Sequence, residues 1–313
     1  MEDIMVSVLV ITYQHKKYIR KALDSVLMQK VGFNIEIIVS DDCSTDGTQE
    51  ILKEYKKKYG NRLKMLLRSK NVGGTINGYY AMIKAAGKYI VIIEGDDFWT
   101  DEYKIQKQVE YLENHPKYMG VFHRCHFVDE YGNRIHVNYE AMYNSKDDYA
   151  ILDFQKGILP GHTASFMYRN IFREERKKYS FYYRIHNLVG DQTLYCILLL
   201  KGNFGWIEDD MSAYRVVVKK NGTNAASIAA KNNNYFMLWK YYCDLEMCML
   251  RKFGKRIDLG VQRKKTAKSA LQRFLRQQTV KNLYIYLKIL VSSCLWNIIS
   301  KMMNYREIKR LEC

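Results

Sequence analysis

Residues 89–97 read Tyr-Ile-Val-Ile-Ile-Glu-Gly-Asp-Asp, an apolar run that ends abruptly in three carboxylates. A short, continuous run rich in β-branched residues is typical of a strand buried on both faces. Similar runs occur earlier, at residues 6–11, 35–40 and 63–67. We therefore expect four buried strands in the first hundred residues, with the acidic cluster at the end of the fourth.

Stretches with the helical period separate these strands, at residues 16–28, 48–59 and 75–86. Strands that alternate with helices of about a dozen residues predict right-handed βαβ units and a mostly parallel sheet flanked by helices, which is the α/β class. The remaining core elements are predicted as helices at 103–114 and 192–201 and strands at 119–123 and 164–168.

Polar residues follow each of the four strands at the point where it stops. They are Thr12 and Tyr13, Asp41 and Asp42, the segment from Arg68 to Gly73, and the cluster from Glu94 to Asp97. In parallel sheets, ligands bind beyond the carboxyl ends of the strands, and these ends meet at one edge. The sequence therefore predicts a polar binding site along that edge.

The cluster Glu94-Gly95-Asp96-Asp97 has no packing role, and the repulsion between its carboxylates is costly unless a cation relieves it. A hard divalent ion, Mn²⁺ or Mg²⁺, is the natural partner for such oxygen ligands. On these residues alone, an acidic turn in which Asp96 caps a helix remains the alternative. The glycine-rich segment 71–78 could turn its amides toward a phosphate, although it matches neither a P-loop nor a dinucleotide fingerprint.

Taken together, these segments resemble family 2 glycosyltransferases of the type that builds bacterial surface polysaccharides. The similarity covers roughly residues 5–220, and the segments that carry it are 8–13, 38–48, 71–73 and 87–97, in the order and spacing of that family. The resemblance implies the GT-A fold, a nucleotide-sugar donor (UDP-linked by expectation) and inversion at the anomeric carbon.

The resemblance also implies roles for individual residues. The donor-binding positions are Thr12, Tyr13, Asp41, Asp42, Arg68, Asn71, Gly73, Glu94, Asp96 and Arg215. Asp96 and Asp97 correspond to the metal site, His162 and Thr163 to the acceptor pocket, and Asp191 to the catalytic base. On local grounds, Asp41 and Asp42 are as consistent with capping the following helix, and Asp191 with an N-cap.

The chain departs from the family pattern in two places. Glu94 stands where the family has the first Asp of its DxD motif, and Val217 stands where it has the histidine of a closing Tyr-Arg-x-His segment. Either Arg215 or a lysine (Lys219 or Lys220) replaces that histidine near the diphosphate, or the interaction is absent. The second departure leaves open a rival interpretation, a sugar-nucleotide-binding regulator or scaffold with impaired catalysis. A nucleotidyltransferase is disfavoured because no triphosphate loop follows the first strand.

The basic charge is concentrated at the end of the chain. Residues 231–313 contain 18 Lys or Arg and 5 Asp or Glu, whereas the whole chain of 313 residues has a net charge of +17. We expect a catalytic domain over residues 1–225 and a basic helical region over residues 226–313. Its apolar stripes, at 267–275 and 283–302, predict docking on an anionic membrane or, alternatively, packing on the core or against a second subunit. The polar residues opposite each stripe argue against a transmembrane span.

Seven scattered cysteines without a CxxC pair indicate a reducing compartment, and the N-terminus lacks the pattern of a signal peptide. We therefore expect a cytoplasmic protein and, if its basic helices dock on the membrane, a peripheral position on the inner face. Its expected partners are the nucleotide-sugar donor and a glycan or lipid-linked acceptor. No nucleic-acid-binding module is recognisable.

Overall fold

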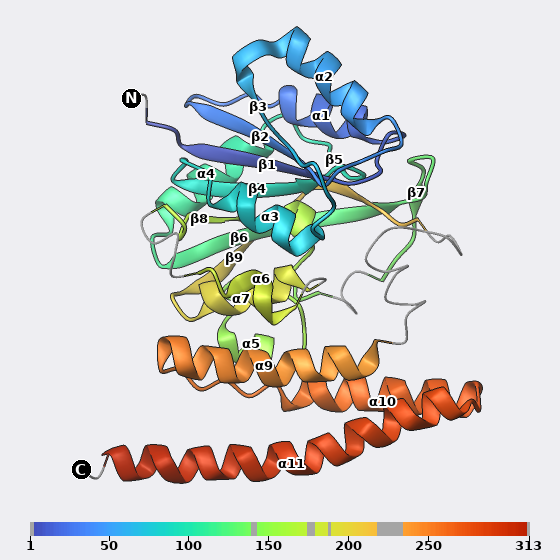
Figure 1. Ribbon diagram of the computed structural model, residues 1–313. Helices are drawn as coiled ribbons and strands as arrows, with labels where there is room; N and C mark the ends of the chain where they lie inside the picture. The colour runs from blue at the N-terminus through green and yellow to red at the C-terminus, as the bar shows by residue number, and fades with distance from the viewer. Residues whose placement is uncertain (1–2, 139–142, 174–178, 187–188, 218–233, 312–313) are drawn as a thin grey trace. The chain divides into compact units, whose positions relative to one another are not determined.

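The computed structural model describes residues 3–138, 143–173, 179–186, 189–217 and 234–311, with side chains up to residue 300 (Figure 1). The chain divides into two compact units. The first, here called the sheet unit, comprises Met1–Phe154 and Ile158–Thr223, and the second, the helical unit, comprises Gln155–Gly157 and Asn224–Cys313.

A mixed sheet forms the centre of the sheet unit. Among the described residues its strands lie in the order β3-β2-β1-β4-β8-β6-β9-β5, and β7 pairs with β6. Their bounds are β1 Val6–Thr12, β2 Ile35–Asp41, β3 Leu63–Leu67, β4 Tyr89–Glu94, β5 Phe98–Trp99, β6 Tyr118–Val128, β7 Arg134–Ile135, β8 Met167–Arg169 and β9 Asn203–Arg215. β1 to β4 pair in parallel, as the sequence predicts, and β8 runs antiparallel to both β4 and β6.

Helices cover both faces of this sheet (Figure 1). They are α1 Ile19–Leu27, α2 Thr48–Tyr59, α3 Gly74–Met82, α4 Lys104–Asn114, α5 Ile151–Gln155, α6 Tyr182–Ile185 and α7 Gly190–Leu199. The apolar sides of α1, α2 and α4 form one core with alternate residues of β1, β2 and β4, such as Val8, Val39 and Val91. Figure 1 shows α3, α6 and α7 on the other side of the sheet. This is the two-sided α/β arrangement that the alternation of strands and helices predicts.

A buried carboxylate joins three parts of the sheet unit. Glu36 of β2 is 5% exposed and accepts hydrogen bonds from the Ser7 hydroxyl (2.5 Å), the Lys64 ammonium (2.6 Å) and the Ala86 amide (2.7 Å). Burial by itself would raise the pKa of Glu36, but these three donors outweigh it and lower the pKa. The ionised carboxylate therefore stabilises the packing of β1, β2 and β3 and the turn into β4.

The structure differs from the sequence-based expectations at two elements. The segment predicted as a strand at 164–168 begins as a 3-10 turn, Thr163–Ser165, because the amides of Ser165 and Phe166 bond back to the carbonyls of His162 and Thr163. The long strand β9 was not predicted, since three acidic residues, 208–210, interrupt its apolar pattern. Its pairing with β6 shifts register around Arg124, and the acidic stretch lies at that irregularity.

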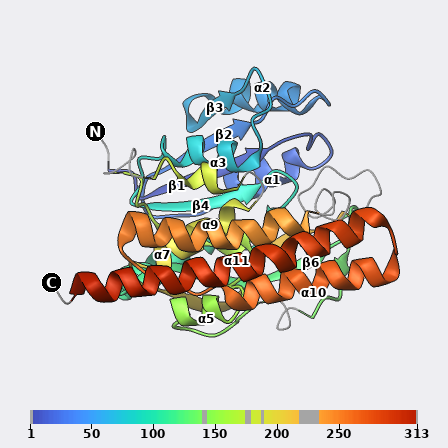
Figure 2. The same ribbon diagram turned by 60° about the horizontal axis from the view of Figure 1, so that its bottom comes forward.

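The helical unit consists, in its described part, of three helices, α9 Tyr235–Phe253, α10 Gly260–Arg276 and α11 Val280–Leu311, which lie side by side in Figure 2. Their common core contains Trp239, Cys243, Ala270 and Ile289. The stretch Val280–Ser300 of α11 is long and apolar enough to cross a membrane by length and composition, with mean hydropathy 1.5. Lys281 and Lys288 are the only charged residues in this stretch, so its polar residues alone do not decide between a span and a helix that lies in the membrane interface.

Candidate active site

The carboxyl ends of the parallel strands bring the predicted polar residues to one edge. Thr12 is level with Asp41 on the neighbouring strand, and Ile11 is level with Glu94 on the other side. Asp41 is in turn level with Leu67, so that Arg68 begins the next loop beside it. All four groups of polar residues follow strand ends at the same edge.

The acidic cluster is a tight turn against β1. The Gly95 amide donates to the Ile11 carbonyl (2.8 Å), and the Asp97 amide donates to the Glu94 carbonyl (3.0 Å). A Cβ atom on Gly95 would lie 2.7 Å from Thr12 Oγ1 and 2.8 Å from His15 Nδ1. Only glycine fits this position, and its absence of a side chain lets the turn approach β1 closely.

Two carboxylate oxygens in this turn are buried without a partner. Asp96 is 6% exposed and Asp97 is 1% exposed, and neither Asp96 Oδ1 nor Asp97 Oδ2 has a hydrogen-bond partner. Burial raises the pKa of Asp97 well above its usual range, with further contributions from the charges of Asp96 and Glu94, while Arg215 opposes the shift. Unpaired, buried acidic oxygens are costly, so the turn is arranged for a positively charged partner.

Glu94 extends this negative charge to a third position. Its side chain is exposed to solvent, yet the protein packed around its carboxyl raises its pKa to about 8, with Asp96 and Asp191 as the next causes. The influence of Asp191 also shows that α7 approaches the acidic turn.

The donor set fits a hard divalent cation that the protein holds by one or two carboxylates. Both orphaned atoms are carboxylate oxygens, the type of ligand that Mn²⁺ and Mg²⁺ prefer. Within the described residues, no group of three His, Cys, Asp or Glu side chains forms a complete protein site. Such a cation would therefore complete its coordination with water and with oxygens of its ligand.

Arg215 holds the acidic turn in place through hydrogen bonds to its backbone and to Asp97. Its amide donates to Asp97 Oδ1 (2.9 Å) and its Nε to the Asp96 carbonyl (2.8 Å), while Nη1 donates to the carbonyls of Asp129 (2.8 Å) and Glu130 (3.1 Å). The guanidinium is 3% exposed. Through these hydrogen bonds Arg215 supports the acidic turn, and its burial leaves little of it accessible at the edge of the sheet.

Asp191 lies in the first turn of α7, after Gly190. A Cβ on Gly190 would meet the Tyr182 hydroxyl at 2.6 Å, so the start of α7 packs closely against α6. The N-cap residue of this helix is Val189, which makes no side-chain cap hydrogen bond, and Asp191 is half-buried. Burial raises the pKa of Asp191, and the amides of Gln192 and of Asp191 itself partly oppose the shift.

Asp41 and Asp42 are engaged within the loops of this edge. Asp41 is fully buried and accepts hydrogen bonds from the amide and hydroxyl of Ser44 and from Gln49 (2.9, 2.5 and 2.6 Å). Asp42 Oδ1 and Oδ2 accept the amides of Val72 and Gly73, both at 2.8 Å. Both carboxylates therefore shape the binding edge, and Asp42 would have to exchange partners to bind a ligand.

The glycine-rich loop lies beside Asp42. Asn71 donates to the Asp42 carbonyl (3.2 Å), and Gly73, with φ +91°, precedes α3. Arg68 is half-buried, donates from Nε to Asn77 Oδ1 (2.7 Å) and lies over the ring of Tyr80 (4.8 Å to its centre).

Aromatic and imidazole rings form another part of the site. His162 is 9% exposed, and its ring lies tilted against that of Tyr214, with 3.8 Å between the ring centres. Burial lowers the pKa of His162 to about 3. It is therefore neutral, and its Nδ1 accepts the Ala164 amide (3.2 Å). Thr163 follows it and is half-buried, as is Tyr13 on the β1 side. Burial raises the pKa of Tyr214, and the negative charges of Glu94, Asp97 and Asp96 raise it further. This pair of rings therefore lies near the acidic turn.

His15 is a member of this site that the sequence reasoning missed. Its Nε2 lies 3.7 Å from Asp96 Oδ2, and its Nδ1 lies 3.3 Å from Thr12 Oγ1. Its place three residues after a predicted edge residue was the available signal. Val217 has no charged group to offer, and Lys219 and Lys220, the proposed substitutes for the family histidine, lie outside the described residues.

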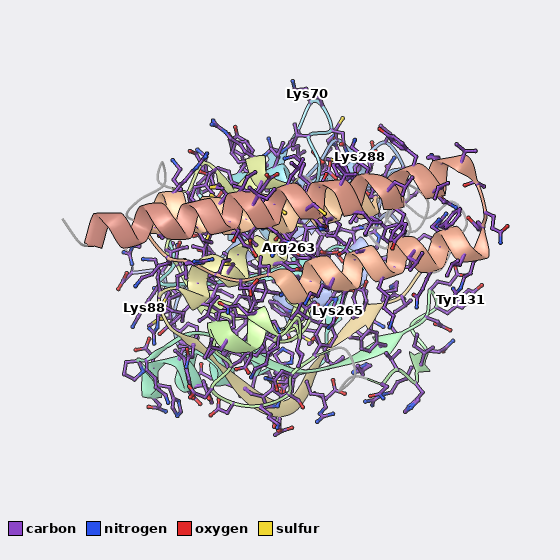
Figure 3. The ribbon with its side chains drawn as sticks, turned by 90° about the horizontal axis from the view of Figure 1, so that it is seen from below. Lys70, Lys88, Tyr131, Arg263, Lys265 and Lys288 are labelled. Carbon is purple, nitrogen blue, oxygen red and sulfur yellow. The ribbon has the colours of Figure 1, made fainter. Side chains whose placement is uncertain are left out.

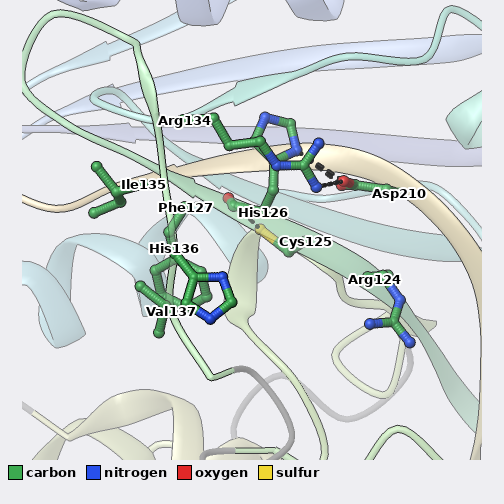
Figure 4. A pocket seen from close by; sticks show the side chains of 9 residues that line it. All are labelled: Arg124, Cys125, His126, Phe127, Arg134, Ile135, His136, Val137 and Asp210. Carbon is green, nitrogen blue, oxygen red and sulfur yellow. Dashed lines mark hydrogen bonds and ion pairs between the residues drawn. The ribbon is translucent and has the colours of Figure 1, made fainter.

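A pocket of about 460 Å³ lies on β6, β7 and β9 (Figure 4). Asp210 pairs there with His126 Nδ1 and with Arg134 Nη2, each at 2.9 Å. Cys125 also lines this pocket; burial raises the pKa of its thiol, and the charges of Asp97 and Asp210 raise it further.

The fold and the site define a class of α/β proteins with an acidic site at the carboxyl edge of the parallel part of a mixed sheet. The profile of glycosyl transferase family 2 matches residues 7–176, and the chain belongs to that family. It has the GT-A fold, as the sequence resemblance implies.

Relatives and solved structures agree with this assignment. The chain is 40% identical over 126 residues to protein Rv1520 of Mycobacterium tuberculosis, which is 40% of this chain and 36% of the relative. It is 26% identical over 238 residues to the minor teichoic acid biosynthesis protein GgaB of Bacillus subtilis, 74% of this chain and 25% of GgaB. The chain thus spans about a third or less of these relatives.

Two solved structures share the fold. S. aureus TarS 1–349 in complex with UDP-GlcNAc superposes with a TM-score of 0.65 at 17% identity, covering 92% of this chain and 80% of that one. The mannosyltransferase PcManGT of Pyrobaculum calidifontis, in complex with GDP-Man and Mn²⁺, has a TM-score of 0.53 at 17% identity, covering 97% and 86%.

Proposed function

We propose that this glycosyltransferase transfers a hexose or N-acetylhexosamine from a UDP-sugar to a hydroxyl of a glycan or lipid-linked acceptor, with inversion, during synthesis of a cell-surface polysaccharide. The observation that carries the proposal is the meeting of Glu94, Asp96, Asp97 and Asp191 at the carboxyl edge of the parallel strands. Similarity to GgaB supports the polysaccharide pathway, and the fold shared with UDP-GlcNAc-bound TarS supports the donor class.

The donor would lie along the edge formed by Thr12, Tyr13, Asp42 and the loop that contains Asn71 and Gly73. Asp42 holds this loop through two amides, and this loop begins a helix whose amides suit a phosphate. We assign Asp41 and Arg215 to shaping the edge and the acidic turn, because both are buried and bonded to the protein. Arg68 remains a candidate contact beside the base.

Asp96 and Asp97 would hold Mn²⁺ or Mg²⁺, through the two oxygens that have no protein partner. When bound, the cation would neutralise negative charge on the diphosphate leaving group. Glu94, beside them and accessible, would contact the donor ribose. The Mn²⁺ in PcManGT, a protein of the same fold, supports a divalent ion in this position.

Asp191 would act as the base. Its carboxylate would accept the proton of the acceptor hydroxyl while that oxygen attacks the anomeric carbon, and the bond to the diphosphate breaks on the opposite side. The neutral His162 and Thr163, at the start of the 3-10 turn, would line the acceptor side. A raised pKa makes Asp191 a stronger base than an exposed aspartate, provided that it is ionised.

The test is turnover of UDP- and dTDP-sugars by the full chain with Mn²⁺, measured as the amount of nucleoside diphosphate released. Asp191→Asn should lower kcat by roughly 10²–10⁴-fold while the donor dissociation constant changes little. Asp209→Asn, at an exposed aspartate of β9, is the matched control and should retain full activity. Full activity of Asp191→Asn would show that the base lies elsewhere.

The rival function is sugar-nucleotide binding by a catalytically impaired regulator or scaffold, which Val217 in place of the family histidine favours. The same assay separates the two. A chain that binds UDP-sugar and Mn²⁺ but turns over no donor in the presence of a cell-envelope glycolipid extract would support the rival. We further propose that the enzyme works in the cytoplasm at the inner face of the membrane, where lipid-linked acceptors are found.

A further inference from the structure

One side of α11 presents an unusually long series of exposed apolar side chains. They are Val280, Leu283, Tyr284, Leu287, Leu290, Val291, Leu295, Ile298 and Ile299, here called the apolar stripe. Steps of three and four residues place them on one side of the helix. Soluble proteins rarely expose contiguous apolar patches of this kind, and larger ones mark interaction sites.

The other side of α11 is also apolar but is used inside the helical unit. Ile289 is fully buried with Trp239, Cys243 and Ala270, and Trp296 packs against the same cluster. The guanidinium of Arg263 lies 5.7 Å from the centre of the Trp296 ring, and Figure 3 shows Arg263 between α10 and α11. The core of the unit therefore accounts for one side of α11, and the apolar stripe lacks a partner among the described residues.

The charges around the apolar stripe are almost all positive. Residues 234–300 contain 13 Lys or Arg and 3 Asp or Glu, and those three acids pair with Lys240 and Arg263. Arg276 and Lys281 are exposed at the start of the apolar stripe. The sequence that follows the stripe, residues 301–310, adds four more Lys or Arg and one Glu.

The apolar stripe and the positive charges around it together indicate what binds to this side of α11. A second copy of the chain would bring the same positive charges to the interface, which like-charge repulsion disfavours. An anionic bilayer offers acyl chains to the apolar stripe and negative head groups to the flanking lysines and arginines. The bilayer complements both features at once.

We propose that α11 docks the protein on an anionic membrane leaflet, with the helix in the plane of the interface and the apolar stripe facing the acyl chains. The length of Val280–Ser300 would also permit a span. A span, however, would remove Ile289 and Trp296 from the core of the helical unit, and only Gln277–Thr279 connect α11 to the basic helix α10. The in-plane arrangement keeps this core intact.

The experiment is flotation of the full chain with vesicles of phosphatidylcholine alone or with roughly 30% phosphatidylglycerol, which makes the vesicle surface negative. The protein should float with the anionic vesicles at least about tenfold more strongly than with neutral ones. A variant with Leu287→Glu, Val291→Glu and Leu295→Glu should lose this binding by about tenfold or more, because it places carboxylates on the apolar stripe.

Leu152→Glu provides a control for the type of substitution, since it introduces one glutamate at an exposed leucine of the sheet unit. It should bind vesicles like the wild type. Circular dichroism of the triple variant should show unchanged helix content, because all three side chains point into solvent. Wild-type binding of the folded triple variant to anionic vesicles would overturn the proposal.

Two further measurements separate the other arrangements. Light scattering of the free protein should show no dimer that the triple variant abolishes; a stripe-dependent dimer without vesicle binding would identify a second copy as the occupant and overturn the proposal. Carbonate at pH ~11 should release the protein from cell membranes, as expected of an interfacial helix. Retention in the membrane pellet would indicate a span. None of these readouts depends on sugar transfer. The proposal of membrane docking can therefore be refuted without refuting the proposed sugar transfer, and the reverse also holds.

Discussion

Replacing Arg215 by methionine tests whether this residue supports the acidic turn or contacts the donor. The side chain is 3% exposed and donates to three carbonyls, those of Asp96, Asp129 and Glu130. Methionine has a similar length and fills most of the same space but donates no hydrogen bond. The backbone bond from residue 215 to Asp97 can still form, so the substitution removes only the guanidinium.

Hydrogen bonds that involve a charged group contribute about 1.5–3 kcal/mol each. The carbonyls of Asp129 and Glu130 are only half-buried, and water can replace part of their bonding. We therefore expect Arg215→Met to lower the free energy of unfolding by about 3–5 kcal/mol, less than the sum of three separate bonds. For a unit of this size, that corresponds to a fall in Tm of roughly 10 °C.

The assay is thermal unfolding followed by circular dichroism, in the absence of donor and metal. Arg20→Met is the control, because Arg20 is exposed and pairs with Glu54 at the surface, and it should leave Tm unchanged. A Tm for Arg215→Met within ~2 °C of the wild type, about 1 kcal/mol or less, combined with loss of turnover, would refute this reasoning. It would show that the guanidinium acts on the donor.

Three other substitutions have defined outcomes. Gly95→Ala should destabilise the acidic turn by about 1–3 kcal/mol and weaken Mn²⁺ binding, because its methyl would meet Thr12 Oγ1 at 2.7 Å; unchanged Tm and Mn²⁺ affinity would contradict this. His15→Gln should weaken Mn²⁺ binding, measured by electron paramagnetic resonance, roughly tenfold at unchanged Tm, since its imidazole lies 3.7 Å from Asp96. Glu36→Gln should cost roughly 1–2 kcal/mol at pH 7. Because folding lowers the pKa of Glu36, its contribution is present above the ordinary carboxyl pKa and is lost as the pH falls through the folded value. Urea unfolding should therefore show wild type and variant converging below about pH 4.5, and a pH-independent difference would be the contrary result.

The sequence by itself determined the parallel part of the sheet and the position of the acidic turn. Both follow from local patterns, since a buried strand needs a continuous apolar run and its end must return the chain to solvent. The positions of Thr12, Asp42, Asn71 and Glu94 at the binding edge could be predicted from these strand ends alone. The strand β9 could not, because an acidic stretch at its irregular pairing with β6 hides its pattern.

Only the tertiary structure decided which polar groups bond to the protein and which remain open to a ligand. Asp41 and Arg215 resemble donor contacts in the sequence, yet both are buried and hydrogen-bonded within the fold, while Asp96 and Asp97 each keep an unpaired oxygen. The same holds for α11, whose two sides are both apolar in sequence although only one packs inside the helical unit. The physical reason is that a local pattern specifies how polar a position is, whereas its partner comes from a distant segment and depends on how the chain packs.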